Sequence, residues 1–210
     1  MATFGTAGNN LIRVSAAGLC RIGMNNGFLL SLNKSRLAKR IRNFTPFGGA
    51  IEFNESAKPF LKELGVIFEK GNDLRFTIPE NNLAELEKWF YLRTEREISP
   101  FRELQEELVE EEKVLPNLPP TAVRSEYLWT IKPARVGTDR PGQEGMITQR
   151  YFEIFNIVFT PEVYENINNH LGETGSRLAV LTAEEILAGK LNIGEGSIGT
   201  NCRYLIEQER

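Results

Sequence analysis

Three carboxylates on one predicted helix are the residues of this sequence best placed to do chemistry. In the stretch RELQEEL, Glu106 follows Glu103 by three residues and Glu107 follows it by four, so the three side chains converge over one helical turn. Converging anions repel one another, and a hard divalent cation, which prefers oxygen ligands, would reverse that balance. The spacing therefore predicts a Mg²⁺ site on this helix, with Mn²⁺ as the alternative metal.

A glycine-rich turn that ends in another carboxylate precedes the helix. Gly49 closes the sequence PFGG, and Glu55 follows after five residues. A lone Gly-Gly turn is a weak signal, and so is a lone Arg-Glu-Leu string, because solvated helices are rich in Glu and Leu at this spacing. The occurrence of both segments in this order, with these flanking residues, is a stronger signal of a functional motif than either segment alone.

Together the two segments resemble the halves of a Nudix box, the pyrophosphate-hydrolase signature G-x5-E-x7-R-E-U-x-E-E-x-G-U, where U is a bulky aliphatic residue. Gly49 and Glu55 satisfy the first half, and RELQEEL satisfies the second. The sequence differs from the signature at two places. Segment 56–101 stands where the signature has a seven-residue spacer, and Val109 and Glu110 occupy the late glycine and aliphatic positions. We therefore expect the helix to continue past the point where the family usually turns.

The resemblance also implies a role for each residue of the motif. The implied metal ligands are Gly49 through its carbonyl, Glu103, Glu106 and Glu107. Glu103 is in addition the candidate general base, and Arg102 would pair with Glu55 to fix the glycine loop against the helix. Many Nudix enzymes recruit one more acid from outside the box, and here Glu144 and Glu153 remain alternatives. The acids that follow the motif, residues 110–112, are expected to form a solvated helix face.

Basic and aromatic residues near the glycine turn are candidate contacts for a phosphate-bearing substrate. The segment before the turn carries five cations with no acid between them, Lys34, Arg36, Lys39, Arg40 and Arg42. Such a run is either a solvated loop or a clamp for substrate phosphates, which arginine holds well through its planar guanidinium. Phe44, Phe47 or Tyr127 would stack on a base or, alternatively, lie in the core. The candidate substrate contacts are Arg40, Arg42 and Phe47.

The remaining chain supplies strands and helices that suit an α/β fold. Residues 11–22 and 27–34 are expected to be strands joined at Asn25-Asn26-Gly27, since Asn-Gly is a strong hairpin signal. Residues 151–159 predict a half-buried strand, and TAEE from Thr182 is a capping box that opens a helix through Leu191. As the resemblance implies, we expect one domain over residues 1–210, a Nudix α/β/α sandwich with a mixed sheet.

Segment 56–100 is expected to fold as a helix–hairpin–helix insertion within the Nudix box. Apolar runs flank Lys70-Gly71-Asn72-Asp73, which suggests a hairpin, and apolar residues between 83 and 90 recur at helical spacing. The aromatic residues 89–91 are expected to pack in the core or in a homodimer interface, with a cap that narrows substrate choice as the alternative. Ser99 is the expected N-cap of the acidic helix that follows.

Composition limits the function classes. A net charge of −3 argues against a general nucleic-acid-binding protein, which would need an excess of Lys and Arg. Cys20 and Cys202 form neither a metal motif nor a disulfide framework, so a reducing compartment is expected. The first residues, MATFGTAGNN, lack a signal-peptide pattern, and no apolar run is long enough to span a membrane. We expect a cytoplasmic protein with no membrane partner.

The phrase FTPFGGAIEF, the run SPFRELQEELVEE and the long spacer resemble the SMODS-associated Nudix family in particular. Members of that family are bacterial proteins encoded beside nucleotide second-messenger synthases in anti-phage systems. The resemblance implies a Mg²⁺-dependent hydrolase of a nucleoside diphosphate linked to another group, with a functional link to such a synthase. Two alternatives stay open: a Nudix-fold sensor that holds a nucleotide without turnover, and an interaction subunit whose aromatic insertion docks a partner.

Overall fold

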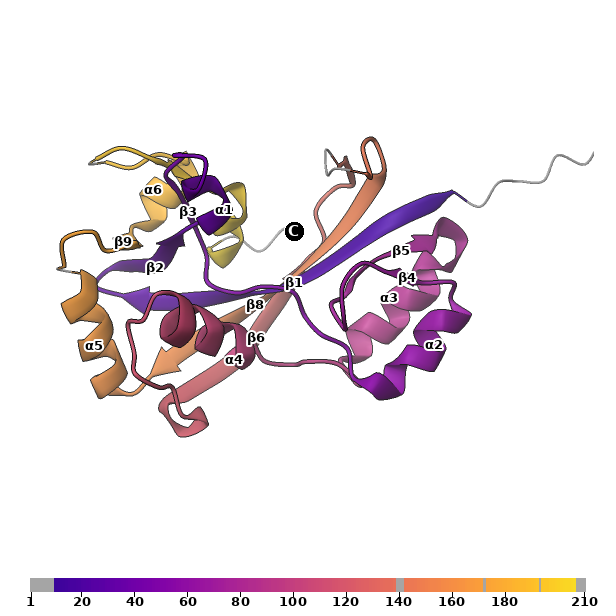
Figure 1. The fold of residues 1–210 in the computed structure, drawn as a ribbon, viewed down its shortest axis with the longest axis horizontal. Helices are drawn as coiled ribbons and strands as arrows, with labels where there is room; N and C mark the ends of the chain where they lie inside the picture. The colour runs from indigo at the N-terminus through magenta and orange to yellow at the C-terminus, as the bar shows by residue number, and fades with distance from the viewer. Residues whose placement is uncertain (1–9, 139–141, 172, 193, 207–210) are drawn as a thin grey trace, which may run out of the picture. The chain divides into compact units, whose positions relative to one another are not determined.

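The chain forms two compact units, each assembled from three separate segments (Figure 1). The computed structural model describes residues 10–138, 142–171, 173–192 and 194–206. Within these ranges, unit 1 comprises segments 10–17, 50–98 and 132–151, and unit 2 comprises segments 18–49, 99–131 and 152–206. Each unit has its own hydrophobic core. The expectation that residues 1–210 form one domain stays a prediction.

Unit 1 packs helices against a small antiparallel sheet. Strand β5 (Arg75–Pro79) pairs on one side with β4 (Ile67–Phe68) and on the other with the start of β1 (Leu11–Met24). Helices α2 (Lys58–Glu63) and α3 (Leu83–Leu92) bury apolar residues in the same core as these strands. A second strand pair joins β7 (Val136–Gly137) to the start of β8 (Ile147–Phe159).

The aromatic residues of α3 differ in their exposure. Trp89 and Phe90 are buried in the core of unit 1, at 7% and 3% exposure. Tyr91 is 49% exposed, although its ring packs edge-on against Phe90. Core packing is therefore confirmed for the first two residues, while a homodimer interface stays a prediction.

Unit 2 is built on a mixed sheet. The end of β1 pairs with β2 (Gly27–Leu32), which also pairs with β3 (Asn43–Thr45) and β9 (Leu178–Leu181), all antiparallel. Strand β10 (Ser197–Ile198) runs parallel to β3, and β6 (Val123–Ile131) runs antiparallel to the second part of β8. This combination of parallel and antiparallel pairs, with helices beside it, is the mixed α/β architecture that the sequence predicted.

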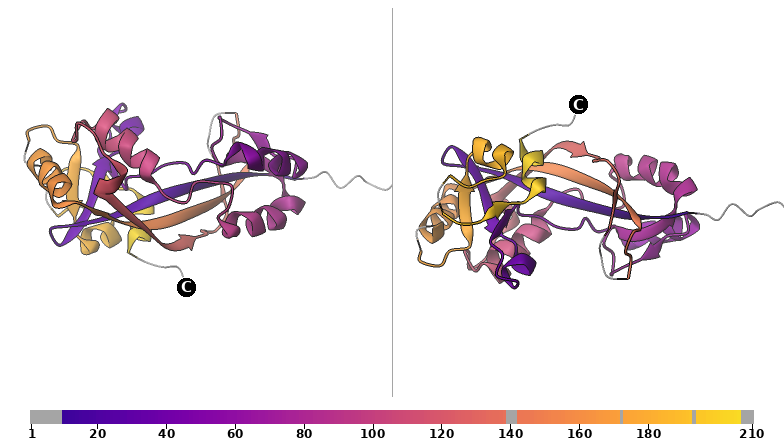
Figure 2. Two further views of the ribbon diagram at one scale, coloured as in Figure 1. Left: turned by 90° about the horizontal axis from the view of Figure 1, so that it is seen from below. Right: turned by 90° about the horizontal axis from the view of Figure 1, so that it is seen from above.

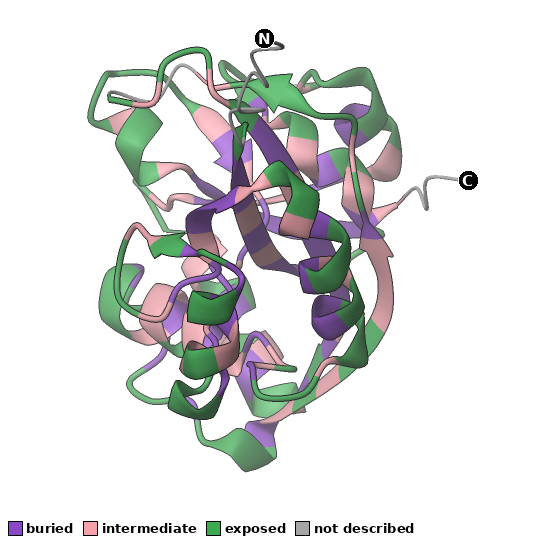
Figure 3. Cartoon of the chain, turned by 90° about the vertical axis from the view of Figure 1, so that its right-hand side faces the viewer, coloured by how far each residue is buried: buried purple, intermediate pink, exposed green. Residues whose placement is uncertain are grey.

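In the part of unit 2 that the structure describes, four segments are α-helical. They are α1 (Lys34–Leu37), α4 (Phe101–Gln105), α5 (Pro161–Leu171) and α6 (Ala183–Ala188). Helix α5 lies beside β9 in all three ribbon views (Figures 1 and 2). Figure 3 colours the chain by burial: α4, α5 and α6 each carry both buried and exposed residues, as amphipathic helices over a core should, whereas α1 has no buried residue. Over the described residues, no helix is long and apolar enough to cross a membrane.

Most of the local predictions are confirmed. Asn25 and Asn26 have φ angles of 47° and 67°, the left-handed conformation that a two-residue hairpin turn needs, and Met24 lies opposite Gly27. The Thr182 capping box is formed in full, although α6 ends at Ala188 because Gly189 adopts a left-handed conformation.

Some boundary predictions are wrong. The strand expected over residues 27–34 ends at Leu32, and Lys34 begins α1. The acidic helix begins at Phe101, and its N-cap is Pro100 rather than Ser99. Proline has no side-chain acceptor, so no side chain caps the first turn of this helix. The start of the helix is held instead by its packing, since Leu104 is fully buried.

Candidate metal and nucleotide site

Helix α4 continues without a break into a π-helical segment, Glu106–Glu111, and we call residues 101–111 the acidic helix. Its inner face is fixed by Leu104 and Leu108, which are fully buried in the core of unit 2. Glu103 and Glu107 directly precede these leucines, so both carboxylates lie at the edge of the buried face. The expectation that the helix runs past residue 109 is confirmed, and the wider π turn occurs where the family signature has its late glycine.

Glu107 and Glu103 both lie against the glycine loop. The Oε2 atom of Glu107 accepts the backbone N–H of Gly48 at 2.7 Å. A Cβ atom added to Gly49 would lie 2.2 Å from Oε2 of Glu103, so the carboxylate occupies the space that a side chain would need. Gly48 has φ of +123°, which favours glycine, and a Cβ there would lie 2.0 Å from the carbonyl oxygen of Gly18. The geometry of the loop therefore requires glycine at position 48, whereas a side chain at position 49 would displace the Glu103 carboxylate.

The loop is held to the sheet by backbone hydrogen bonds. The Gly18 N–H donates to the Gly49 carbonyl and the Cys20 N–H to the Phe47 carbonyl, each at 2.9 Å. The Gly49 carbonyl, a predicted metal ligand, thus already accepts one hydrogen bond and retains a second lone pair. Because the loop is bonded to a strand, it presents Gly48 and Gly49 to the acidic helix in a fixed position.

Glu107 lies in an environment that disfavours negative charge. Burial raises the pKa of Glu107 from its ordinary value of 4.5 to about 8, against the opposing effect of the Gly48 N–H, and neighbouring carboxylates add to the rise. Those neighbours are Glu103, Glu111 and Glu112. Burial also raises the pKa of the Cys20 thiol, to which Glu107 and Glu103 contribute, so Cys20 is a neutral neighbour. A cation placed among these groups would offset their repulsion.

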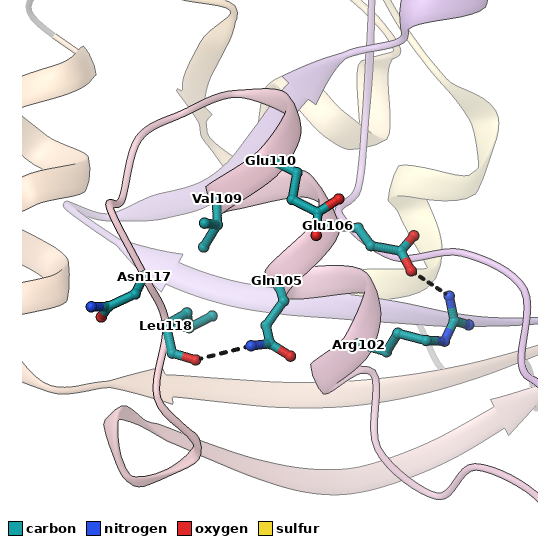
Figure 4. A pocket seen from close by; sticks show the side chains of 7 residues that line it. All are labelled: Arg102, Gln105, Glu106, Val109, Glu110, Asn117 and Leu118. Carbon is teal, nitrogen blue, oxygen red and sulfur yellow. Dashed lines mark hydrogen bonds and ion pairs between the residues drawn. The ribbon is translucent and has the colours of Figure 1, made fainter.

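Arg102 engages the other two acids of the motif. Its guanidinium lies 3.0 Å from Oε1 of Glu103 and 3.0 Å from Oε1 of Glu106. The Glu106 side chain is 44% exposed and borders a hollow of about 240 Å³ on the outer face of the acidic helix, where Figure 4 shows its bond to Arg102. Gln105 crosses the same hollow to donate a hydrogen bond to the Leu118 carbonyl.

The three predicted carboxylates are therefore not equivalent. Glu103 and Glu107 lie against the glycine loop, whereas no contact joins Glu106 to that loop among the described residues. Arg102 pairs with both Glu103 and Glu106. In the part of the chain that the structure describes, no three His, Cys, Asp or Glu side chains are grouped closely enough to hold a metal ion as they stand. In chemical kind the donors still fit a hard divalent cation, since Glu103, Glu107 and the Gly49 carbonyl all offer oxygen. The ligand roles remain predictions.

Glu55 lies in unit 1, where it begins a 3₁₀ turn. Its carboxylate is 67% exposed and forms an ion pair of 3.1 Å with Lys58. The predicted pairing of Glu55 with Arg102 joins residues of different units and stays a prediction.

The structure distinguishes the two candidates for an additional acid. Glu153 lies on β8 and is 1% exposed. It precedes Phe155 by two residues, so it shares the sheet face whose side chains pack with the acidic helix. Glu144 belongs to unit 1, is exposed, and accepts a hydrogen bond from the Gly142 N–H at 3.0 Å. Only Glu153 shares a unit and a sheet face with the acidic helix.

The basic segment, residues 34–42, is attached to the far end of the acidic helix. Lys34 forms an ion pair of 2.7 Å with Glu111. The other four cations, Arg36, Lys39, Arg40 and Arg42, are exposed, and none has an ion-pair partner among the described residues. Their charge is thus available to an anion.

Two of the three aromatic residues predicted as possible contacts for a substrate base are buried. Phe47 is fully buried in the core of unit 2, so its predicted contact with a substrate base is wrong for this conformation, and Phe44 is only 5% exposed. Tyr127 is the aromatic candidate that remains accessible, at 37% exposure.

Arg177 is a residue that sequence reasoning missed. Its Nε lies 2.8 Å from Oε2 of Glu112, and its Nη2 donates to the Glu111 carbonyl at 3.0 Å. The Glu112 side chain is only 4% exposed, so the expectation of a solvated face is wrong at Glu112, while Glu110 and Glu111 are exposed as expected. Arg177 thereby fastens the C-terminal end of the acidic helix. No local signal revealed this contact, because the partners are 65 residues apart.

The chain matches one protein family over nearly all of its described length. Residues 11–206 match the family model described as "SMODS-associated NUDIX domain". No curated protein and no solved structure matches the chain.

Proposed function

Because the chain belongs to the SMODS-associated NUDIX family, we propose that it hydrolyses the diphosphate link of a nucleoside diphosphate joined to another group. One observation carries the proposal: Glu103 and Glu107 are packed against the glycine loop, the two halves of the Nudix signature in contact. In this reading, segment 56–100 is an insertion that separates the halves in sequence.

Mg²⁺, or Mn²⁺ in its place, is the proposed cofactor. The residues that would hold it are Glu103, Glu107, the Gly49 carbonyl and, once released from Arg102, Glu106. When bound, the ion would neutralise the charge of a diphosphate and make a water molecule a better nucleophile at neutral pH. The raised pKa of Glu107 supports this assignment, since an added cation would offset the repulsion that causes part of it.

The remaining steps fall to side chains of the chain itself. Glu103 would take the proton of the attacking water, as a general base within reach of the reacting group. Arg102, which already contacts Glu103, would keep that carboxylate in place. Glu153 is the proposed additional acid, because it lies buried on the sheet face beside the acidic helix.

The basic segment is the proposed clamp for substrate phosphates. Arg40 and Arg42 are exposed, and the segment is linked to the acidic helix through Lys34 and Glu111. Arginine binds phosphate oxygens with two parallel N–H donors, which orients as well as attracts the substrate. Phe47 has no part in this proposal.

The family description supports a role in nucleotide signalling. We place the protein in the bacterial cytoplasm, in an anti-phage system, with a nucleotide-type small molecule as its ligand and a functional link to a nucleotide second-messenger synthase. We also propose that the protein forms a homodimer whose interface includes the exposed Tyr91 of α3.

Single-turnover product formation tests the proposal directly. A panel of nucleoside diphosphates linked to sugars, nucleosides or phosphates is incubated with excess protein and Mg²⁺ or Mn²⁺, and product is quantified. Glu103→Gln should retain binding but lose turnover by a factor on the order of 10²–10⁴, the usual effect of losing a general base. Glu110→Gln, an exposed acid of the same helix, is the matched control. Parental rates in Glu103→Gln would refute the role of Glu103.

A second candidate function is a sensor that binds a nucleotide without turnover. The ion pairs of Arg102 favour it, because its guanidinium holds both Glu103 and Glu106, and these two predicted ligands would have to be released before a metal ion could bind them. Tight binding by the parent protein, with no product from any substrate under either metal, would establish the sensor and exclude the hydrolase.

A further inference from the structure

Arg177 connects the end of the acidic helix to strand β2. Its guanidinium donates from Nε to Oε2 of Glu112 at 2.8 Å, and from Nη2 to the Glu111 carbonyl at 3.0 Å. Its own carbonyl accepts the N–H of Leu32, the last residue of β2, at 2.9 Å. Because the main chain of Arg177 is bonded to the sheet, its two contacts hold the helix end at a fixed place.

The residues that Arg177 holds belong to the π turn that carries Glu107. The Glu112 N–H donates to the Glu107 carbonyl at 2.8 Å, which is the bond between residues five apart that defines π geometry. The Glu112 carboxylate is 4% exposed, and a buried carboxylate needs a hydrogen-bonded cation beside it. Arg177 therefore acts on the backbone of Glu107 through Glu112.

The same strand also fixes the glycine loop, so the contacts form a closed circuit. The Glu107 carboxylate accepts the Gly48 N–H at 2.7 Å. The glycine loop follows β3, and Phe44 of β3 lies opposite Leu32 in the pairing of β2 with β3. The helix and the loop are thus both attached at Leu32, one through Arg177 and the other through Phe44.

We propose that Arg177 is a positioning residue for the metal site, which holds the π turn so that the Glu107 carboxylate meets the glycine loop. This rests on the proposed function for the role of Glu107 as a ligand. Partners that orient a metal ligand from outside the site contribute roughly 10- to 100-fold to metal affinity. Loss of the Arg177 contacts frees the last residues of the π turn, and Glu107 loses its fixed place against Gly48.

A double variant, Arg177→Met with Glu112→Gln, separates position from charge in calorimetric titrations of Mg²⁺ at pH 7. It leaves no unpaired charge buried, so it should fold, and it loses one positive and one negative charge, so the net charge near the site is unchanged. It should bind Mg²⁺ roughly 10- to 100-fold more weakly than the parent protein. Glu112→Gln alone keeps a side-chain oxygen for the Arg177 Nε–H and should stay close to the parental affinity.

The single variant Arg177→Met tests the sign of the effect. Charge alone predicts tighter Mg²⁺ binding when a nearby cation is removed, whereas a positioning role predicts weaker binding. Lys113→Met is the matched control, because Lys113 is an exposed cation that directly follows Glu112. This control should not weaken Mg²⁺ binding.

The bond between Gly48 and Glu107 can also be followed without any metal. In the ¹⁵N-labelled, metal-free protein, the amide resonance of Gly48 should shift in the double variant. It should keep its parental position in Lys113→Met. This measurement depends on the placement of Glu107 and not on whether an ion binds there.

The outcomes bear separately on Arg177 and on the proposed function. Parental Mg²⁺ affinity in the double variant would overturn the positioning role and leave the metal site intact. A parent protein that binds no Mg²⁺ would refute the proposed metal site, and the Gly48 resonance would then decide the role of Arg177. A shifted resonance in the double variant supports that role, and an unchanged one overturns it.

Discussion

Replacing Glu107 with glutamine should stabilise the metal-free protein, although Glu107 is a proposed ligand. Burial raises the pKa of Glu107 to about 8, so the folded state resists ionisation of this group while the unfolded state ionises near pH 4.5. A glutamine oxygen still accepts the Gly48 N–H, but it carries no charge. The substitution thus removes an electrostatic cost and keeps the hydrogen bond.

The size and sign of the effect follow from that pKa. Below pH 4.5 both states of the parent protein are protonated, and Glu107 costs nothing. Between pH 4.5 and about 8 the unfolded state binds fewer protons than the folded state, so the stability of the parent protein falls as pH rises. At pH 7 the free energy of unfolding of Glu107→Gln should exceed that of the parent protein by about 2–3 kcal/mol, after discounting for the partial exposure of the side chain.

Urea unfolding in EDTA at pH 5, 7 and 8.5 measures this difference. Trp129 reports on unit 2, so a Trp89→Phe background isolates the transition of the unit that contains Glu107. The advantage of Glu107→Gln should be small at pH 5 and largest at pH 8.5. Glu106→Gln is the control: it removes a partly exposed ion pair with Arg102, so its effect should be under about 1 kcal/mol and unfavourable. A Glu107→Gln variant that is no more stable than its parent at pH 8.5 would refute the reasoning.

Two further predictions concern the glycine loop and the end of the acidic helix. Gly49→Ala should displace the Glu103 carboxylate, which lies 2.2 Å from the added Cβ, and should weaken Mg²⁺ binding measured by calorimetry while changing stability little, because the end of a flexible side chain can move. Arg177→Ala should leave the buried carboxylate of Glu112 without its partner and lower the free energy of unfolding by on the order of 2–3 kcal/mol in urea titrations.

Each of these predictions has a matched control. Gly23→Ala adds a Cβ to the same strand-rich region with no atom within 4 Å, so its Mg²⁺ affinity should equal that of the parent protein. Lys34→Ala removes an exposed ion pair at the same end of the helix and should cost under about 1 kcal/mol. Unchanged Mg²⁺ affinity in Gly49→Ala, or equal stabilities of Arg177→Ala and Lys34→Ala, would contradict the assigned contacts.

Local signals in the sequence predicted the structural features that depend only on residues near one another in the chain. The hairpin turn at Asn25 and Asn26 follows from the tolerance of asparagine for positive φ, and the helix at Thr182 follows from a capping box only four residues long. The approach of the glycine loop to the acidic helix was predictable only through the family signature, because Gly49 and Glu103 are far apart in sequence.

Features that depend on long-range packing escaped prediction. The burial of Glu112 depends on Arg177, and the burial of Phe47 depends on the backbone bond that draws the loop onto β1. The difference between Glu106 and the two acids on the glycine loop accompanies the change from α to π geometry, which begins at Glu106. Helical spacing alone places the three carboxylates on one turn of the helix and does not predict that Glu106 differs from the other two.

Calorimetric titration of Mg²⁺ at pH 7 tests the central claim, that Glu103 and Glu107 on the glycine loop form a divalent-cation site. The parent protein should bind Mg²⁺ and release a proton, seen as a dependence of the binding heat on the buffer, because Glu107 is largely protonated before the cation displaces that proton. Glu110→Gln should behave as the parent protein does. Glu103→Gln and Glu107→Gln should each bind Mg²⁺ far more weakly, and Glu107→Gln should release no proton. Unchanged Mg²⁺ affinity in both variants would contradict the claim.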